Sequence, residues 1–198
     1  MKKVQKMKTQ TDTKRNTKII TIPNILSVVR LCMIPWIVWL YCVKEEYILT
    51  TVVLTLSGLT DIVDGFIARR FNMISDIGKA LDPIADKLTQ IAMMLCLVSR
   101  FPYVLIPLVL LIAKEIFAAV MGILVIKSTG SVQGAVWHGK LTTVCIYALM
   151  VLHLLWSNIP STVSLISVGV CSGFMIMSCI LYSINNVGLL KNAKNKKQ

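Results

Sequence analysis

Long apolar runs separated by short polar stretches dominate the chain. Crossing the hydrocarbon core of a membrane takes about 20 residues of helix. Six runs are long enough to do so: 25–43, 47–68, 80–98, 102–126, 137–157 and 161–184. The gaps between them are short and hold charged or turn-forming residues. The pattern predicts an all-α integral membrane protein with six transmembrane helices.

Basic, polar segments flank this apolar region. Seven lysines and arginines lie within the first 18 residues, and four lysines close the chain. We therefore expect a flexible basic tail over 1–18, a six-helix domain over 19–186 and a basic C-terminal tail over 187–198.

Composition supports a membrane location for the chain. Its 198 residues are 56% hydrophobic and 15% charged, against about 25% charged in soluble domains. The net charge of +12 does not favour nucleic acid as a partner, because the basic residues gather in the tails and no basic-aromatic platform accompanies them. Such tails are typical of cytoplasmic flanks that touch anionic lipid headgroups.

The distribution of positive charge predicts the orientation in the membrane. Six spans place both termini on one side, and loops on the opposite side hold only Lys44 and Arg100. Because cytoplasmic loops carry the excess of lysine and arginine, both termini are expected in the cytoplasm.

Cysteine and histidine offer no metal or redox motif in the sequence. None of the six cysteines forms a C-x-x-C pair, and all lie in apolar runs. They are interpreted as small buried hydrophobic residues rather than disulfides or metal ligands. Two isolated histidines are too few for a zinc site.

Five of the nine acidic residues lie between 61 and 86, in "DIVDGFIARRFNMISDIGKALDPIAD". Asp61 and Asp64 are three apart, which places them on one helix face, and Asp82 and Asp86 are four apart on the next. A short turn would make the two helices antiparallel neighbours with four converging carboxylates. Such a cluster must bind cations or take up protons. Oxygen ligands alone favour hard divalent ions, and two such ions would balance four aspartates. Asp76 falls outside this pattern.

Small residues and one arginine accompany the aspartates. Gly65, Ala68 and Gly78 serve either close helix packing or a groove for an extended ligand. Arg69 is either an arginine that extends its charge to the membrane surface or a group that holds an anion such as a diphosphate.

Together these residues resemble the signature of the CDP-alcohol phosphotransferases, D-x2-D-G-x2-A-R-x8-G-x3-D-x3-D. All eight specified residues and both spacings match between 61 and 86. The segment "PNILSVVR" at 23–30 is also similar to the family's P-N-x-x-T-x-x-R, with Ser27 in place of threonine. The resemblance covers roughly residues 20–186.

The resemblance implies a membrane enzyme of phospholipid biosynthesis. It would transfer the phosphatidyl group of CDP-diacylglycerol to an alcohol and release CMP, at a cavity on the cytoplasmic side. The implied cofactors are two divalent cations, Mg²⁺ or Mn²⁺. The resemblance also implies a homodimer and a multi-pass protein of a bacterial-type cell membrane.

The same resemblance assigns roles to individual residues. The metal ligands would be Asp61, Asp64, Asp82 and Asp86, and Asp86 would also be the general base. The residues that admit or hold the cytidine nucleotide would be Gly65, Ala68, Arg69 and Gly78, with Asn24 and Arg30 close by.

The acceptor alcohol is less clearly specified. Members that make phosphatidylglycerol phosphate carry R-E-F in the fourth span and G-K-x-K-T at the fifth, whereas this chain has "AKEIF" at 113–117 and "GKLTT" at 139–143. Lys114 either pairs with Glu115 or meets an acceptor phosphate, and Lys140 is either a second acceptor residue or a positive anchor. Glycerol 3-phosphate is the first expectation, followed by phosphatidylglycerol (giving cardiolipin) and inositol phosphate.

Two other classes of function remain open from the residues alone. A divalent-cation transporter would place acids along a pathway near the membrane centre, and a structural protein would not need four aligned carboxylates. Neither explains an arginine beside acids gathered at one membrane end.

Overall fold

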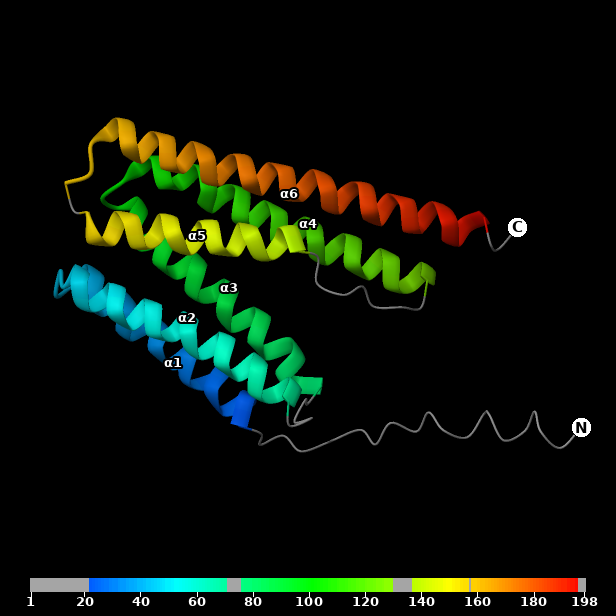
Figure 1. The fold of residues 1–198 in the computed structure, drawn as a ribbon, viewed down its shortest axis with the longest axis horizontal. Coiled ribbons are helices and arrows are strands. Elements are labelled where there is room, and N and C mark those ends of the chain that lie inside the picture. Colours follow the sequence, from blue (N-terminus) through cyan, green and yellow to red (C-terminus); the bar gives the residue numbers. More distant parts are fainter. Residues whose placement is uncertain (1–21, 71–75, 130–136, 157, 196–198) are drawn as a thin grey trace, which may run out of the picture. The chain divides into compact units, whose positions relative to one another are not determined.

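The computed structural model describes residues 22–70, 76–129, 137–156 and 158–195. For 22–24, 61–70, 76–80, 129, 138 and 191–195 it describes the helix but not the side chains. The described residues form six α-helices and one short 3₁₀ helix, with no strand among them (Figure 1). In chain order these are α1 (Ile22–Cys42), α2 (Tyr47–Arg70), α3 (Asp76–Val98), η2 (Pro102–Val104), α4 (Leu105–Thr129), α5 (Trp137–Leu155) and α6 (Ser161–Asn195).

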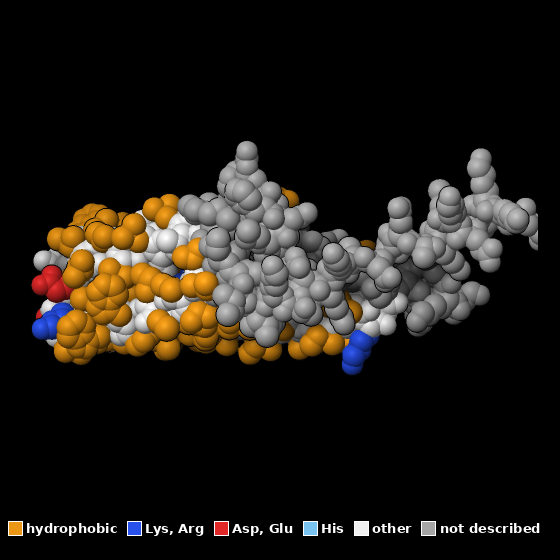
Figure 2. Space-filling view, turned by 90° about the horizontal axis from the view of Figure 1, so that it is seen from below, with side chains coloured by type: hydrophobic (Ala, Val, Ile, Leu, Met, Phe, Trp, Pro, Cys, Tyr) orange, Lys and Arg blue, Asp and Glu red, His pale blue; other side chains and the backbone are white. Residues whose placement is uncertain are grey.

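The helices follow the apolar runs closely, which confirms the all-α prediction. Three of them contain stretches long and apolar enough to cross a membrane: Ile25–Cys42, Pro102–Ser128 and Ser161–Leu190. Two shorter apolar stretches, Tyr47–Thr60 and Gly139–Leu155, lie in α2 and α5. Figure 2 shows hydrophobic side chains over most of the coloured surface of one face, with charged groups at its ends. An outer surface of this kind fits a membrane protein, because lipid is its solvent.

Two helix features differ from the sequence expectations. The helix α3 begins at Asp76 rather than at residue 80, where the predicted span starts, so Pro83 lies well inside it instead of in its first turn. In addition, α6 continues to Asn195, beyond residue 184 where the predicted span ends. Its 35 residues make a helix about 52 Å long, which exceeds the ~30 Å of hydrocarbon that one crossing requires.

The chain divides into two compact units, and the division passes through the first three helices. The first unit holds the described residues up to Ile37 together with 52–89. The second holds 38–51 and everything from Gln90 onward. In the second unit α6 packs against both α4 and α5.

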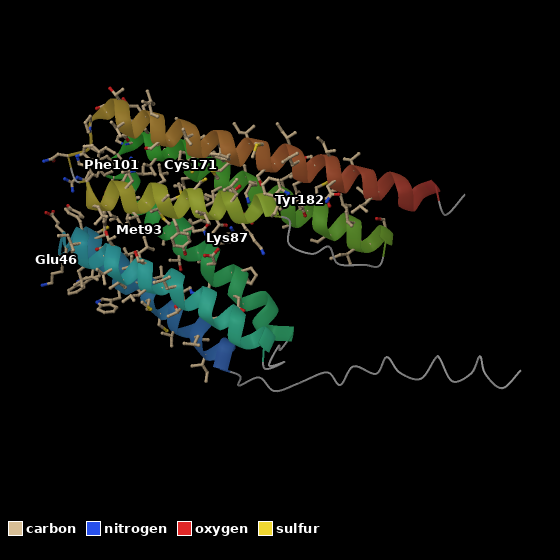
Figure 3. The ribbon with its side chains drawn as sticks, viewed as in Figure 1. Glu46, Lys87, Met93, Phe101, Cys171 and Tyr182 are labelled. Carbon is tan, nitrogen blue, oxygen red and sulfur yellow. The ribbon has the colours of Figure 1, made fainter. Side chains whose placement is uncertain are left out.

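A tyrosine and a glycine mark the packing of α4 against α6. The Tyr182 hydroxyl donates to the Ala118 carbonyl oxygen at 3.3 Å, and the side chain extends from α6 toward α4 (Figure 3). The same hydroxyl would lie 3.9 Å from a Cβ built on Gly122. Small residues on α4 thus leave the room in which Tyr182 reaches the backbone of its neighbour.

A buried histidine joins α5 to α6. His153 Nδ1 lies 2.8 Å from the Leu149 carbonyl oxygen, and a carbonyl only accepts, so Nδ1 carries the proton. Nε2 therefore accepts from the Ser164 hydroxyl, 2.9 Å away. The Phe101 ring packs edge-on against the imidazole at 4.9 Å between centroids. Both ring nitrogens are satisfied, which burial requires.

We expect Ser164→Ala to destabilise the fold by roughly 1–3 kcal/mol, because it leaves His153 Nε2 buried without a donor. Thermal unfolding in detergent measures the effect as a lower midpoint. Ser167→Ala is the matched control on the same helix. Among the described residues, its hydroxyl bonds only to the Ser164 carbonyl oxygen one turn away. Its removal should therefore change the free energy of unfolding by no more than about 0.5 kcal/mol. Equal effects of the two variants would contradict the assigned role of Ser164.

The cysteine prediction is only partly right. Cys96 and Cys171 are buried, as expected of small apolar residues, but Cys145 and Cys179 are half-buried. Two others, Cys32 and Cys42, are exposed. The error arises because an apolar run in a membrane protein supplies outward-facing positions as well as core positions.

Candidate functional site

Two of the four motif aspartates, Asp82 and Asp86, lie one turn apart on α3. Both are half-buried, and the Asp86 side chain is 17% exposed. The Lys87 ammonium lies 4.0 Å from Asp86 Oδ2. Two partly shielded carboxylates on one helix face concentrate negative charge and therefore attract a cation.

Helix α1 turns two polar residues, Ser27 and Arg30, inward. Ser27 and Arg30 are 1% and 2% exposed, whereas Ile25, Val28 and Val29 are about half exposed. Polar residues inside and apolar residues outside are the arrangement expected where lipid is the solvent. Ser27 and Arg30 are three positions apart and so share the buried face.

A hydrogen bond joins this face to the aspartates. The Ser27 hydroxyl donates to Asp82 Oδ1, and the two residues are 55 positions apart in the chain. Ionised carboxylates have about four acceptor positions, so this bond restrains the group while leaving oxygen lone pairs for a further ligand. In the sequence, Ser27 stands out only as the replacement for a threonine. Its place in the P-N-x-x-S-x-x-R segment was the signal that could have identified it.

The remaining residues of the motif are placed by helix only. Asp61, Asp64, Gly65, Ala68 and Arg69 belong to α2, and Gly78 belongs to the start of α3. Because both segments are helical, the spacings place Asp61 with Asp64, and Gly78 with Asp82 and Asp86, on shared faces. The structure does not describe the side chains of these α2 residues, nor those at positions 24 and 78.

The chemistry of the described groups fits a hard divalent cation. They supply carboxylate and hydroxyl oxygens, which Mg²⁺ and Mn²⁺ prefer. Ser57, one turn before Asp61 on α2, is 1% exposed, and its hydroxyl has no hydrogen-bond partner within the described part of the chain. Among side chains that the structure describes, no three of His, Cys, Asp and Glu gather. The aspartates at 61 and 64 are not among those side chains.

The two candidate acceptor residues belong to the second unit. Lys114 Nζ lies 2.8 Å from Glu115 Oε1 within α4, so the ion pair, one of the two alternatives that the sequence left open for Lys114, is present. The two side chains are 15% and 30% exposed. Lys140 is exposed in the first turn of α5.

The fold and these residues define a helical membrane protein with carboxylates paired on a helix. A model of the CDP-alcohol phosphatidyltransferase family matches residues 20–182. The chain belongs to this family.

Three relatives illustrate the similarity. A CDP-diacylglycerol–glycerol-3-phosphate 3-phosphatidyltransferase of Aquifex aeolicus is 33% identical over 174 residues, covering 86% of this chain and 83% of the relative. A cardiolipin synthase (CMP-forming) of Streptomyces coelicolor is 39% identical over 124 residues, covering 60% of this chain and 55% of the relative. The human cardiolipin synthase (CMP-forming) is 46% identical over 69 residues, covering 34% of this chain and 23% of the relative. The match therefore spans only about half of the Streptomyces protein.

Proposed function

We propose that the protein transfers the phosphatidyl group of CDP-diacylglycerol to an alcohol and releases CMP. The complete D-x2-D-G-x2-A-R-x8-G-x3-D-x3-D motif within a chain of this family carries the proposal. The Ser27–Asp82 hydrogen bond supports it, because it holds a motif carboxylate in a buried polar setting.

Four carboxylates hold the cofactors in this proposal: Asp61, Asp64, Asp82 and Asp86. The cofactors are two divalent cations, Mg²⁺ or Mn²⁺, which when bound neutralise the diphosphate and stabilise charge on the departing CMP. Such transfers need positioning and electrostatics more than covalent chemistry.

The chain's own residues orient the donor and move one proton. Gly65, Ala68 and Gly78 leave space for the nucleotide, and Arg69 binds its phosphates with charge-assisted hydrogen bonds. Asp86 takes the proton of the acceptor hydroxyl. The acceptor oxygen then bonds to the phosphorus that carries diacylglycerol, and the bond from that phosphorus to CMP breaks.

The first helix contributes to the nucleotide side of the site. Arg30 is buried on the same face of α1 as Ser27, and Ser27 reaches a motif aspartate. Burial of a guanidinium is costly unless anions or acceptors surround it, so Arg30 suits a position near the donor's phosphates. Asn24 lies at the start of the same helix.

The protein spans the membrane six times in this proposal, with both termini and the site on the cytoplasmic side. The supporting observations are six helices at the six apolar runs and the concentration of basic residues in the tails. We also propose that the protein forms a homodimer and lies in a bacterial-type cell membrane.

Glycerol 3-phosphate is the proposed acceptor, which makes phosphatidylglycerol phosphate the product. The Aquifex aeolicus relative, which aligns with 86% of this chain, bears a name with that acceptor. Two of the relatives described above are named cardiolipin synthases, so phosphatidylglycerol is the second candidate.

Release of CMP tests the proposal and the acceptor together. Purified protein is incubated with CDP-diacylglycerol, Mg²⁺ or Mn²⁺, and one alcohol at a time: glycerol 3-phosphate, phosphatidylglycerol, inositol phosphate or serine. We expect metal-dependent CMP release with glycerol 3-phosphate. CMP release with phosphatidylglycerol alone would identify phosphatidylglycerol as the acceptor instead. No CMP release from folded protein with any alcohol would contradict the proposed enzyme activity.

Lys114 offers a sharper test of the acceptor. If its ammonium binds the acceptor phosphate, Lys114→Gln removes a charge-assisted hydrogen bond of about 1.5–3 kcal/mol. We expect the KM for glycerol 3-phosphate to rise roughly 10–100-fold, with the KM for CDP-diacylglycerol unchanged. Lys127→Gln near the end of the same helix is the control. An unchanged KM for the acceptor would leave Lys114 with only its ion pair to Glu115.

A further inference from the structure

Two cysteines from different helices meet in the second unit. The Sγ atoms of Cys42 and Cys96 are 3.7 Å apart, although the residues are 54 positions apart in the chain. Cys42 is the last residue of α1 and is exposed, whereas Cys96 is buried in the last turn of α3. Neither residue has a role in the proposed transfer.

Both cysteines border polar ends of their helices. Cys42 precedes Lys44 by two residues, and Cys96 precedes Arg100 by four. Charged residues mark the membrane–water boundary, so a polar reagent in water can reach the exposed thiol. In the orientation proposed above, these ends lie on the side of the membrane opposite the cytoplasm. Disulfides persist on that side, because it is the oxidising one.

We propose that Cys42 and Cys96 are an oxidisable dithiol that forms a disulfide between α1 and α3, with a low-molecular-weight disulfide as the oxidant. The Cys42 thiolate attacks one sulfur of the oxidant, which forms a mixed disulfide and releases one thiol. The Cys96 thiolate then attacks the Cys42 sulfur and releases the second thiol. Two protein thiols are oxidised, the oxidant is reduced to two thiols, and no other reactant is needed.

The contact between the sulfurs favours the bond. Disulfide formation shortens their separation from 3.7 Å to about 2.05 Å, and both cysteines lie in the last turns of their helices. The different exposures of the two thiols set the order of events. Cys42 is open to the oxidant, and Cys96 is shielded from it but in contact with the Cys42 sulfur.

The test uses the full chain in detergent micelles, with Cys32→Ser as the background because it removes the other exposed thiol. After incubation with cystine, intact mass spectrometry should show loss of two hydrogens. Peptide mapping without reduction should show a cross-link between Cys42 and Cys96. The oxidised protein should unfold several degrees higher, because the bond restricts the unfolded chain, and a thiol reductant should reverse the shift.

Single variants test the order of attack. Adding Cys96→Ser should leave one cysteine adduct at Cys42, and adding Cys42→Ser should leave Cys96 unmodified in the folded protein. A persistent adduct at Cys42 with Cys96 present, a cross-link to another cysteine, or no reaction would overturn the proposal. None of these readouts measures CMP release, so failure here is distinct from failure of the proposed function.

Discussion

Replacing Asp82 by asparagine is expected to reduce metal-dependent CMP release by about three orders of magnitude. The substitution keeps the shape of the side chain and its bond from Ser27, but it removes the charge that holds a divalent cation. Bound metal supplies several kcal/mol of transition-state stabilisation, and each 1.36 kcal/mol corresponds to a tenfold change in rate. Initial rates at saturating CDP-diacylglycerol measure the loss.

Asp76→Asn is the matched control, because it removes an aspartate from the same stretch of sequence but outside the motif. It should retain activity within a few-fold. Binding of Mn²⁺, followed by the loss of its free electron paramagnetic resonance signal, should weaken for Asp82→Asn and not for Asp76→Asn. Full activity of Asp82→Asn, or equal losses in both variants, would remove the basis for the carboxylate site.

Removing the Ser27 hydroxyl should weaken Mn²⁺ binding about 10–100-fold, the range found for groups that orient a metal ligand. Ser27→Ala leaves Asp82 Oδ1 without its donor inside a buried polar region. The carboxylate is then free to rotate, so ordering it becomes part of the cost of binding metal. Direct Mn²⁺ titration without substrate measures this effect separately from turnover.

Ser27→Thr provides the control for the Ser27 hydroxyl. It keeps the hydroxyl and restores the threonine of the pattern that 23–30 resembles, so metal affinity should stay near that of the original chain. If Ser27→Ala and Ser27→Thr lower affinity equally, then Ser27 matters for packing rather than for orienting Asp82. Raised Mn²⁺ concentrations should rescue CMP release by Ser27→Ala, which a purely structural defect would not permit.

Helix positions were predictable because the membrane imposes a simple rule. A backbone in hydrocarbon must satisfy its own hydrogen bonds, so each apolar run of sufficient length becomes a helix. All six runs became helices, with most ends within a few residues of the expected ones. The exceptions are the start of α3 at Asp76 and the end of α6 at Asn195, where polar residues extend a helix beyond its apolar part.

Partners across helices were not predictable, because periodicity along one helix carries no information about the register of its neighbour. Nothing in the sequence pairs Ser27 with Asp82, Cys42 with Cys96, or His153 with Ser164. These contacts join residues 55, 54 and 11 positions apart. Even the burial of cysteines was only partly right, because lipid-facing and core-facing positions are both apolar.

The sequence by itself determined the class of the protein, since eight residue types at set spacings and six apolar runs are properties of the chain order. It also determined which chemical groups are available to the site, because the oxygen ligands, the small residues and the arginine are identified from the order of residues alone. Only the tertiary structure decided that the polar face of α1 turns inward and that its serine meets Asp82. The reason is physical: hydrogen bonds and sulfur contacts depend on distances of a few ångströms, which packing alone sets.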